Sequence, residues 1–211
     1  MPFAGVPHAA TAFYAELEED NSRSFWSANA GRFDRDVRGP MASLLEELSE
    51  EFGAGRIFRP HRDVRFSQDK SPFKTHQGIF VPVGRRTGWY AEVSADGFRV
   101  GGGCYHLEPA ALTAYRRAVD GPRGARLETV TAQLEAAGWE ITGDALRTAP
   151  RGYPRDHPRI GLLRRRSLAA VRWIEDGDVV TTPLLADEVR ADWRRLRPLV
   201  EWLREVAGGE S

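Results

Sequence analysis

The hydrophobic pattern of this chain changes its period near Gly55, and this change most constrains the fold. Before Gly55, apolar residues such as Leu44 and Leu48 recur every three or four positions, which is the spacing of an amphipathic helix. After it, the helical spacing ends, and residues 78–83 and 88–94 have the pattern expected of strands. The segregation of helices and strands predicts an α+β domain, because a doubly wound fold needs their strict alternation.

Helices are expected at both ends of the chain. Thr11 is placed to cap a first helix, and a second helix is expected from Ser24 until Gly39-Pro40 breaks or kinks it. Residues 182–183 open a final helix with one apolar stripe. These helices are expected to pack on the sheet.

The sheet is expected to be mainly antiparallel. A short turn at residues 95–97 joins two strands, a further strand is expected at residues 62–66, and residues 139–147 are expected to form a hairpin. No linker or repeat divides the sequence, so we predict a single domain over residues 1–211, with residues 1–10 as a flexible N-terminus.

Composition excludes several classes of protein. The chain has 30 basic and 30 acidic residues, which argues against a dedicated duplex-DNA binder. The single cysteine, Cys104, excludes an intrachain disulfide and every multi-cysteine metal site, and no histidines have paired ligand spacing. We therefore expect no metal and no cofactor. Without a signal peptide or an apolar span, the protein is expected to be cytoplasmic and away from membranes.

Two rare residue types gather in two short segments. The chain has only two lysines, Lys70 and Lys74, and only two asparagines, Asn21 and Asn29. Both lysines lie in the segment from Arg62 to His76. Because a lysine ammonium differs physically from a guanidinium, this clustering indicates that the residue type matters there.

The segment from Arg62 to His76 is the first candidate site. The residues expected to bind an anionic group are Arg62, Arg65, Lys70 and Lys74. His76 is the candidate catalytic residue, because a histidine exchanges protons near neutral pH. An alternative remains open, in which Asp63 pairs with Arg65, or Asp69 with a lysine, to hold a turn.

Three consecutive glycines form the second candidate site. The residues are Gly101, Gly102 and Gly103. Their backbone N–H groups could approach a ligand oxygen, or the glycines could serve close packing or a bulge. Tyr105, which follows them, is a second catalytic candidate, whereas Cys104 is expected to be a small buried residue. We expect this segment to lie beside residues 62–76.

Several motifs together carry a resemblance that spans nearly the whole chain. They are Phe13-Tyr14, the run from Asn21 to Trp26, residues 62–76, residues 101–105 with Pro109, Leu112 and Arg116, and residues 150–153 with His157-Pro158. With these motifs the chain resembles domain of unknown function family 2461, conserved proteins of bacteria and fungi. The sequence departs from the family at Ser22, where an asparagine is usual, and at Arg164 and Arg166, where lysines are frequent. The resemblance implies no established activity.

The sequence therefore predicts binding of an anionic small molecule, with a phosphate or carboxylate group, in a basic cleft. Whether the protein is an enzyme is left open. One alternative is a nucleic-acid-associated protein that uses the basic segments 56–86 and 147–172, although the zero net charge argues against nucleic acid as the main partner. Another is a structural or partner-binding protein whose arginines pair with its own acids.

Overall fold

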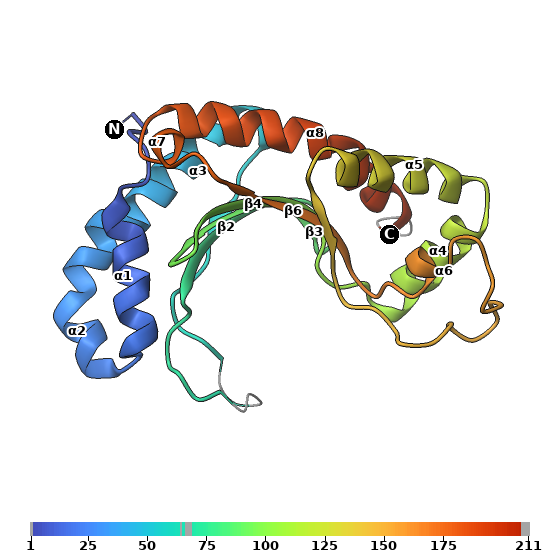
Figure 1. The fold of residues 1–211 in the computed structure, drawn as a ribbon, viewed down its shortest axis with the longest axis horizontal. Coiled ribbons are helices and arrows are strands. Elements are labelled where there is room, and N and C mark those ends of the chain that lie inside the picture. Colours follow the sequence, from blue (N-terminus) through green and yellow to red (C-terminus); the bar gives the residue numbers. More distant parts are fainter. Residues whose placement is uncertain (1, 64, 66–68, 208–211) are drawn as a thin grey trace. The chain divides into compact units, whose positions relative to one another are not determined.

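A computed structural model describes residues 2–63, 65 and 69–207, and Figure 1 shows the fold. The helices are α1 (His8–Glu19), α2 (Arg23–Arg32), the π-helical η1 (Phe33–Arg38), α3 (Gly39–Phe52), α4 (Pro109–Asp120), α5 (Arg123–Ala136), α6 (Ile160–Leu163), α7 (Gly177–Val180) and α8 (Leu184–Ala207). The strands are β1 (Arg56–Ile57), β2 (His76–Gly84), β3 (Thr87–Ser94), β4 (Gly97–Cys104), β5 (Glu140–Thr142) and β6 (Leu168–Ile174).

The strands form a six-stranded sheet in the order β1-β2-β3-β4-β6-β5. At one edge β1 is antiparallel to β2, and at the other β5 is antiparallel to β6, with Ile141 opposite Ala170. The predicted α+β class is therefore confirmed. The predicted hairpin within residues 139–147 is wrong, because β5 pairs with β6 and Ala145 forms a bridge with Arg165.

The chain divides into two compact units. Unit 1 comprises residues 1–81, 90–100 and 173–191, and unit 2 comprises residues 82–89, 101–172 and 192–211. Each unit has its own buried side chains, and the prediction of one domain over residues 1–211 stays a prediction.

In unit 1, helical structure continues from α2 through η1 into α3. A break at Gly39-Pro40 is therefore absent, and the alternative of a kink stays a prediction. Pro40 lies in the first turn of α3, where a missing N–H costs little. The π-helical turn before it alters the hydrogen-bond pattern at the point where the proline ring would otherwise clash with the carbonyl of the preceding turn. Gly39 allows the backbone to pass close to the π-helical turn, because a Cβ at that position would lie 3.0 Å from the Asp34 carbonyl oxygen.

The described part of the N-terminal segment, residues 2–10, contains buried side chains, whereas a flexible N-terminus is expected from the sequence over residues 1–10. Phe3 and Val6 are buried, and the backbone N–H of Val6 donates to the carbonyl oxygen of Val180 at 2.8 Å. Helix α1 already begins at His8 instead of following Thr11. Burial of these apolar side chains holds the segment in place.

In unit 2, α4 and α5 contact one another, and α6 contacts α4. Their core includes Tyr115 and Trp202, whose rings meet edge to face with centroids 5.8 Å apart, and Trp89 stacks on Trp193.

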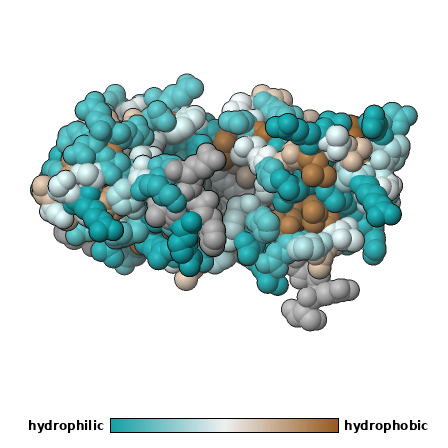
Figure 2. Space-filling model, turned by 90° about the horizontal axis from the view of Figure 1, so that it is seen from below, coloured by the Kyte–Doolittle hydropathy of each residue, from teal (hydrophilic) through white to brown (hydrophobic). Residues whose placement is uncertain are grey.

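Figure 2 shows that hydrophilic side chains cover most of one face, with hydrophobic side chains gathered in the half of the view that holds α4 and α6. Among the described residues, no helix is both long and apolar enough to cross a membrane.

Candidate functional site

The candidate site of unit 1 is built on the polar face of β3. Alternation along the strand places Trp89, Ala91 and Val93 on one face and the residues between them on the other. Glu92 on that other face is buried, with 5% of its side chain exposed. It accepts hydrogen bonds from the hydroxyl of Tyr90 and the guanidinium of Arg99. A buried carboxylate is stable only when it is paired in this way.

His76 approaches the same carboxylate from β2. Its Nε2 atom lies 3.9 Å from Glu92 Oε2, and 38% of its side chain is exposed. Burial lowers the pKa of His76, and although Glu92 acts in the opposite direction, the charges of Lys74, Arg99 and Arg62 lower it further. A neutral imidazole at neutral pH is able to accept a proton. We refer to His76, Tyr90, Glu92 and Arg99 as the Glu92 cluster.

Lys74 adds a positive charge close to the cluster. Its ammonium lies 5.2 Å from the centre of the Phe58 ring, and among the described residues it has no ion pair with a carboxylate. Burial lowers the pKa of Lys74, and the nearby charges of Arg59 and Arg62 lower it further. Like charges that lie close together disfavour the charged form of each group, and Lys74 has no carboxylate of its own among the described residues to offset this.

Asn21 holds the backbone next to Lys74. Its amide donates to the carbonyl oxygen of Phe73 at 3.0 Å and accepts from the Phe73 N–H at 3.1 Å. Ser22, where the resembled family usually has asparagine, caps α2 by accepting from the N–H of Phe25 at 3.1 Å. Asn21 and Lys74, two residues of rare types in this chain, therefore lie in one contact region. At position 22, a hydroxyl is sufficient to cap the helix.

Aromatic rings surround the cluster. The Arg99 guanidinium lies 5.1 Å from the centre of the Trp173 ring, and the ring centroids of Phe58 and Tyr90 are 6.3 Å apart. Gly78 leaves room for Tyr90, because a Cβ at that position would lie 2.8 Å from the Tyr90 ring and hydroxyl. The low polarity of these walls strengthens charge interactions inside the site.

The other predicted anion ligands have partners of their own. Arg65 pairs with Asp63 at 2.7 Å, as the alternative expected, whereas Arg62 pairs with Asp69, a pair that the alternative did not name. Lys70 is exposed. A strand was predicted at residues 62–66, but its described residues, Arg62, Asp63 and Arg65, are not in a strand. Residues 64 and 66 lie outside the described part of the chain.

The glycine triplet lies inside β4, and its neighbours are protein atoms. A Cβ at Gly101 would lie 2.8 Å from Val171 Cγ1, one at Gly102 3.1 Å from Val200 Cγ2, and one at Gly103 2.3 Å from the Leu168 carbonyl oxygen. These distances favour the close-packing interpretation of the triplet.

The contacts described for His76 and for the glycine triplet do not join the two segments. Those of His76 are with groups of unit 1, whereas the triplet packs against residues of unit 2. That the segments lie side by side stays a prediction. Tyr105, the second catalytic candidate, also belongs to unit 2, where it is 53% exposed and its ring faces the guanidinium of Arg86.

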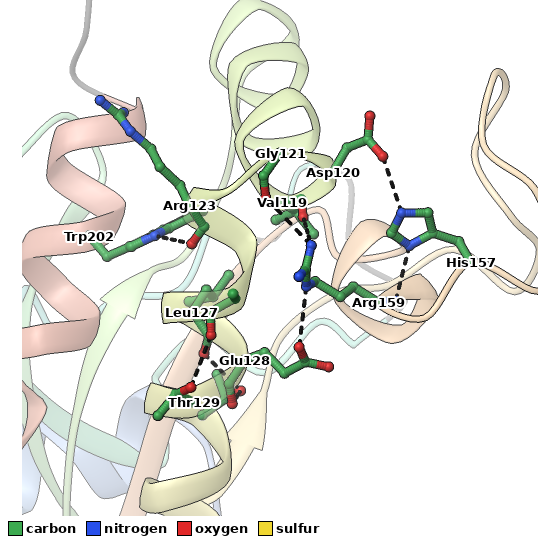
Figure 3. Close-up of polar contacts among 12 residues, drawn as sticks. Val119, Asp120, Gly121, Arg123, Leu127, Glu128, Thr129, His157, Arg159 and Trp202 are labelled. Atoms are coloured by element: carbon green, nitrogen blue, oxygen red, sulfur yellow. Dashed lines mark hydrogen bonds and ion pairs between the residues drawn. The ribbon is translucent and has the colours of Figure 1, made fainter.

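Cys104 and His157 have structural contacts. Cys104 is buried, and its thiol donates to the carbonyl oxygen of His106. Figure 3 shows His157 between Asp120 and Arg159. His157 Nδ1 accepts from the Arg159 N–H at 3.0 Å, so its Nε2 carries the proton and donates to Asp120 at 3.1 Å. Both ring nitrogens are used, which leaves none for catalysis.

Glu92, Tyr90 and Arg99 were missed by the sequence analysis. The alternation in residues 87–94 places Tyr90 and Glu92 on one face of a strand, whereas Arg99 lies on the following strand, β4. Within residues 2–63, 65 and 69–207, no group of three or more histidine, cysteine or carboxylate side chains could hold a metal ion.

Comparison with known proteins gives one match. A family model described as "Conserved hypothetical protein (DUF2461)" matches residues 9–202. No curated protein and no solved structure matches the chain.

Proposed function

Because the chain belongs to the DUF2461 family of conserved hypothetical proteins, whose description names no activity, we propose a function from the chemistry of the Glu92 cluster. Unit 1 binds a small molecule through an anionic phosphate or carboxylate group. His76 exchanges a proton with the bound molecule, and Lys74 supplies the main attraction for its charge.

The observation that carries this proposal is the environment of Lys74. Its half-buried ammonium lies close to Arg59 and Arg62 and has no carboxylate partner among the described residues. Such an arrangement is unfavourable until an anion enters, and functional sites are where unfavourable charge is concentrated. An anion there would also lie near His76, because Lys74 and Arg62 both act on its pKa.

The roles within the cluster follow from the contacts. Glu92 is neutralised by Arg99 and held by Tyr90, so it positions these groups and takes no part in attracting an anion. Burial, with Glu92 as the second cause, raises the pKa of Tyr90 above its ordinary range, which keeps its hydroxyl protonated as a donor. His76 is a partly exposed group of the cluster, and burial lowers its pKa, so its imidazole is neutral at neutral pH and is able to accept a proton.

Three arginines of residues 147–172 weigh against the nucleic-acid alternative. Arg159 bonds to Glu128, Arg166 to Asp144 and Arg172 to Asp192. Arginines that are paired within the chain are less available to phosphates. These pairs favour a small anion in unit 1 over a nucleic-acid track along this segment.

The test is a chemical-shift titration of the folded chain with sulfate, followed by NMR. Lys74→Met keeps the apolar stem over Phe58 and removes the charge, and it should weaken sulfate binding roughly tenfold, the cost of one charge-assisted hydrogen bond. Arg35→Met is the matched control, because Arg35 is an exposed residue of unit 1 that pairs with Asp36. Equal weakening by both substitutions would contradict a defined site.

A further inference from the structure

Unit 2 contains a hollow of about 1370 Å³ that the proposed function does not use. It lies between the turn that joins β2 to β3, helix α4, the turn between α4 and α5, and the last turn of α8. We call it the arginine hollow after five residues that line it: Arg85, Arg86, Arg117, Arg123 and Arg204. Among its described lining residues, the acids are Glu108 and Glu205, so cations are in excess.

The arginines differ in how they are paired. Arg85 and Arg86 both bond to Glu108, at 2.9 and 3.1 Å. In the described part of the chain, the guanidinium groups of Arg117, Arg123 and Arg204 have neither an ion pair nor a hydrogen bond, and all three residues are exposed. Figure 3 shows the Arg123 side chain extending away from the network around Arg159.

Rigid backbone holds these groups around the hollow. The indole of Trp202 donates to the carbonyl oxygen of Arg123 at 3.1 Å, which ties the start of α5 to α8. Gly124 allows the turn before it to close, because a Cβ there would lie 1.9 Å from the Val119 carbonyl oxygen. On the other side, a Cβ at Gly84 would lie 3.4 Å from Arg204 Cγ, so the end of α8 meets the β2–β3 turn.

The rest of the lining indicates what kind of molecule fits. Apart from Arg117, the residues of α4 that line the hollow have small side chains: Ala110, Ala111, Thr113, Ala114 and Ala118. None of the described lining residues is phenylalanine, tyrosine or tryptophan. A ligand would therefore be held by ionic contacts at the rim, with no aromatic ring on which a base could stack.

We infer that the arginine hollow binds a molecule that carries several linked phosphate groups. A guanidinium matches the oxygens of a phosphate with two parallel hydrogen bonds. A chain of phosphates presents oxygens on all sides, which suits arginines that approach from three separate elements. Its multiple charges also match the excess of cations.

The test measures the binding of inorganic tripolyphosphate by isothermal titration calorimetry. It uses the full chain with Lys74→Met, so that the anion site proposed for unit 1 is weakened from the start. Arg117→Gln, Arg123→Gln and Arg204→Gln should each raise the Kd roughly tenfold, and the triple variant should lose binding. Arg126→Gln is the matched control, because Arg126 is exposed one turn further along α5 and is not among the described residues of the lining.

A second measurement distinguishes loss of binding from misfolding of a variant. Tripolyphosphate at about 1 mM should raise the melting temperature of the control but not that of the triple variant, with both giving the same far-UV circular dichroism without ligand. A nucleoside triphosphate that binds no tighter than tripolyphosphate would show that the phosphate chain is the whole recognised group. A nucleoside triphosphate that binds tighter than tripolyphosphate would identify the ligand as a nucleotide. Absence of tripolyphosphate binding, or equal weakening by Arg126→Gln, would overturn the inference.

Discussion

The Glu92 cluster contains one arginine and the arginine hollow five, and the two regions differ in how the charges are paired. In the cluster, a buried carboxylate is neutralised by Arg99 and fixed by Tyr90. In the hollow, Arg117, Arg123 and Arg204 are exposed, with no acidic partner in the described part of the chain. Charge in the first region is part of what holds the fold together, because breaking a buried pair is costly. Charge in the second is available to a ligand.

This comparison predicts that substitutions in the two regions separate stability from binding. Changes in the Glu92 cluster should lower the free energy of unfolding, and changes in the arginine hollow should leave it nearly unchanged.

Glu92→Leu should have the largest effect. It leaves the partly buried Arg99 without its carboxylate and Tyr90 without its acceptor, and should lower the free energy of unfolding by about 3 to 5 kcal/mol. Urea denaturation measures this loss. The double variant Glu92→Leu/Arg99→Met removes both charges and should recover part of the stability. A loss below about 1 kcal/mol in the single variant would show that the pair is too well hydrated to matter.

His157→Leu should have the next largest effect, although His157 belongs to unit 2. The substitution removes the partner of Asp120 and leaves the Arg159 N–H without its acceptor. The expected loss is about 1 to 3 kcal/mol, measured by urea denaturation. His157→Asn should lose less, because its side-chain oxygen can still accept from that N–H. An equal loss in both variants would contradict the role of Nδ1.

His76 should make stability depend on pH. Because burial and neighbouring cations lower the pKa of His76 in the folded state, the unfolded chain binds the proton more readily. Stability from this group is therefore present above about pH 6.5 and lost as the pH falls toward the lowered pKa. The melting temperature of the wild type should fall further than that of His76→Gln between about pH 7 and pH 5.

Sulfate binding should show the opposite pH dependence. An anion beside His76 favours the protonated imidazole, so affinity should rise as the pH falls through the same range. Sulfate itself takes up no proton there. In His76→Gln the affinity should stay nearly constant, and an unchanged pH dependence in this variant would place the anion away from His76.

The arginines of the hollow should have the smallest effect on stability. Arg117→Gln, Arg123→Gln and Arg204→Gln should each change the free energy of unfolding by less than about 0.5 kcal/mol, because exposed side chains without partners contribute little. Urea denaturation without ligand measures this. A loss above about 1 kcal/mol in any of them would show that the arginine supports the fold, and would remove the contrast with the Glu92 cluster.

Local sequence patterns predicted most of the helices and strands in their order, but not the pairing of residues 139–147. The change of period near Gly55 separated helices from strands, and the turn at residues 95–97 joined β3 to β4 as expected. These features depend on neighbours in sequence, which is why local patterns predict them. The concentration of lysine and asparagine also pointed to Lys74 and Asn21, which lie together in unit 1.

Tertiary structure alone decided which groups meet. The pairing of β5 with β6, the contact of Asn21 with Phe73, and the position of Arg204 near Gly84 each join residues far apart in sequence. The same holds for burial: Glu92 looks like an ordinary surface carboxylate in sequence, and its importance comes from the removal of water around it. A charge gains or loses its partners through the packing of distant segments, and no local pattern records that packing.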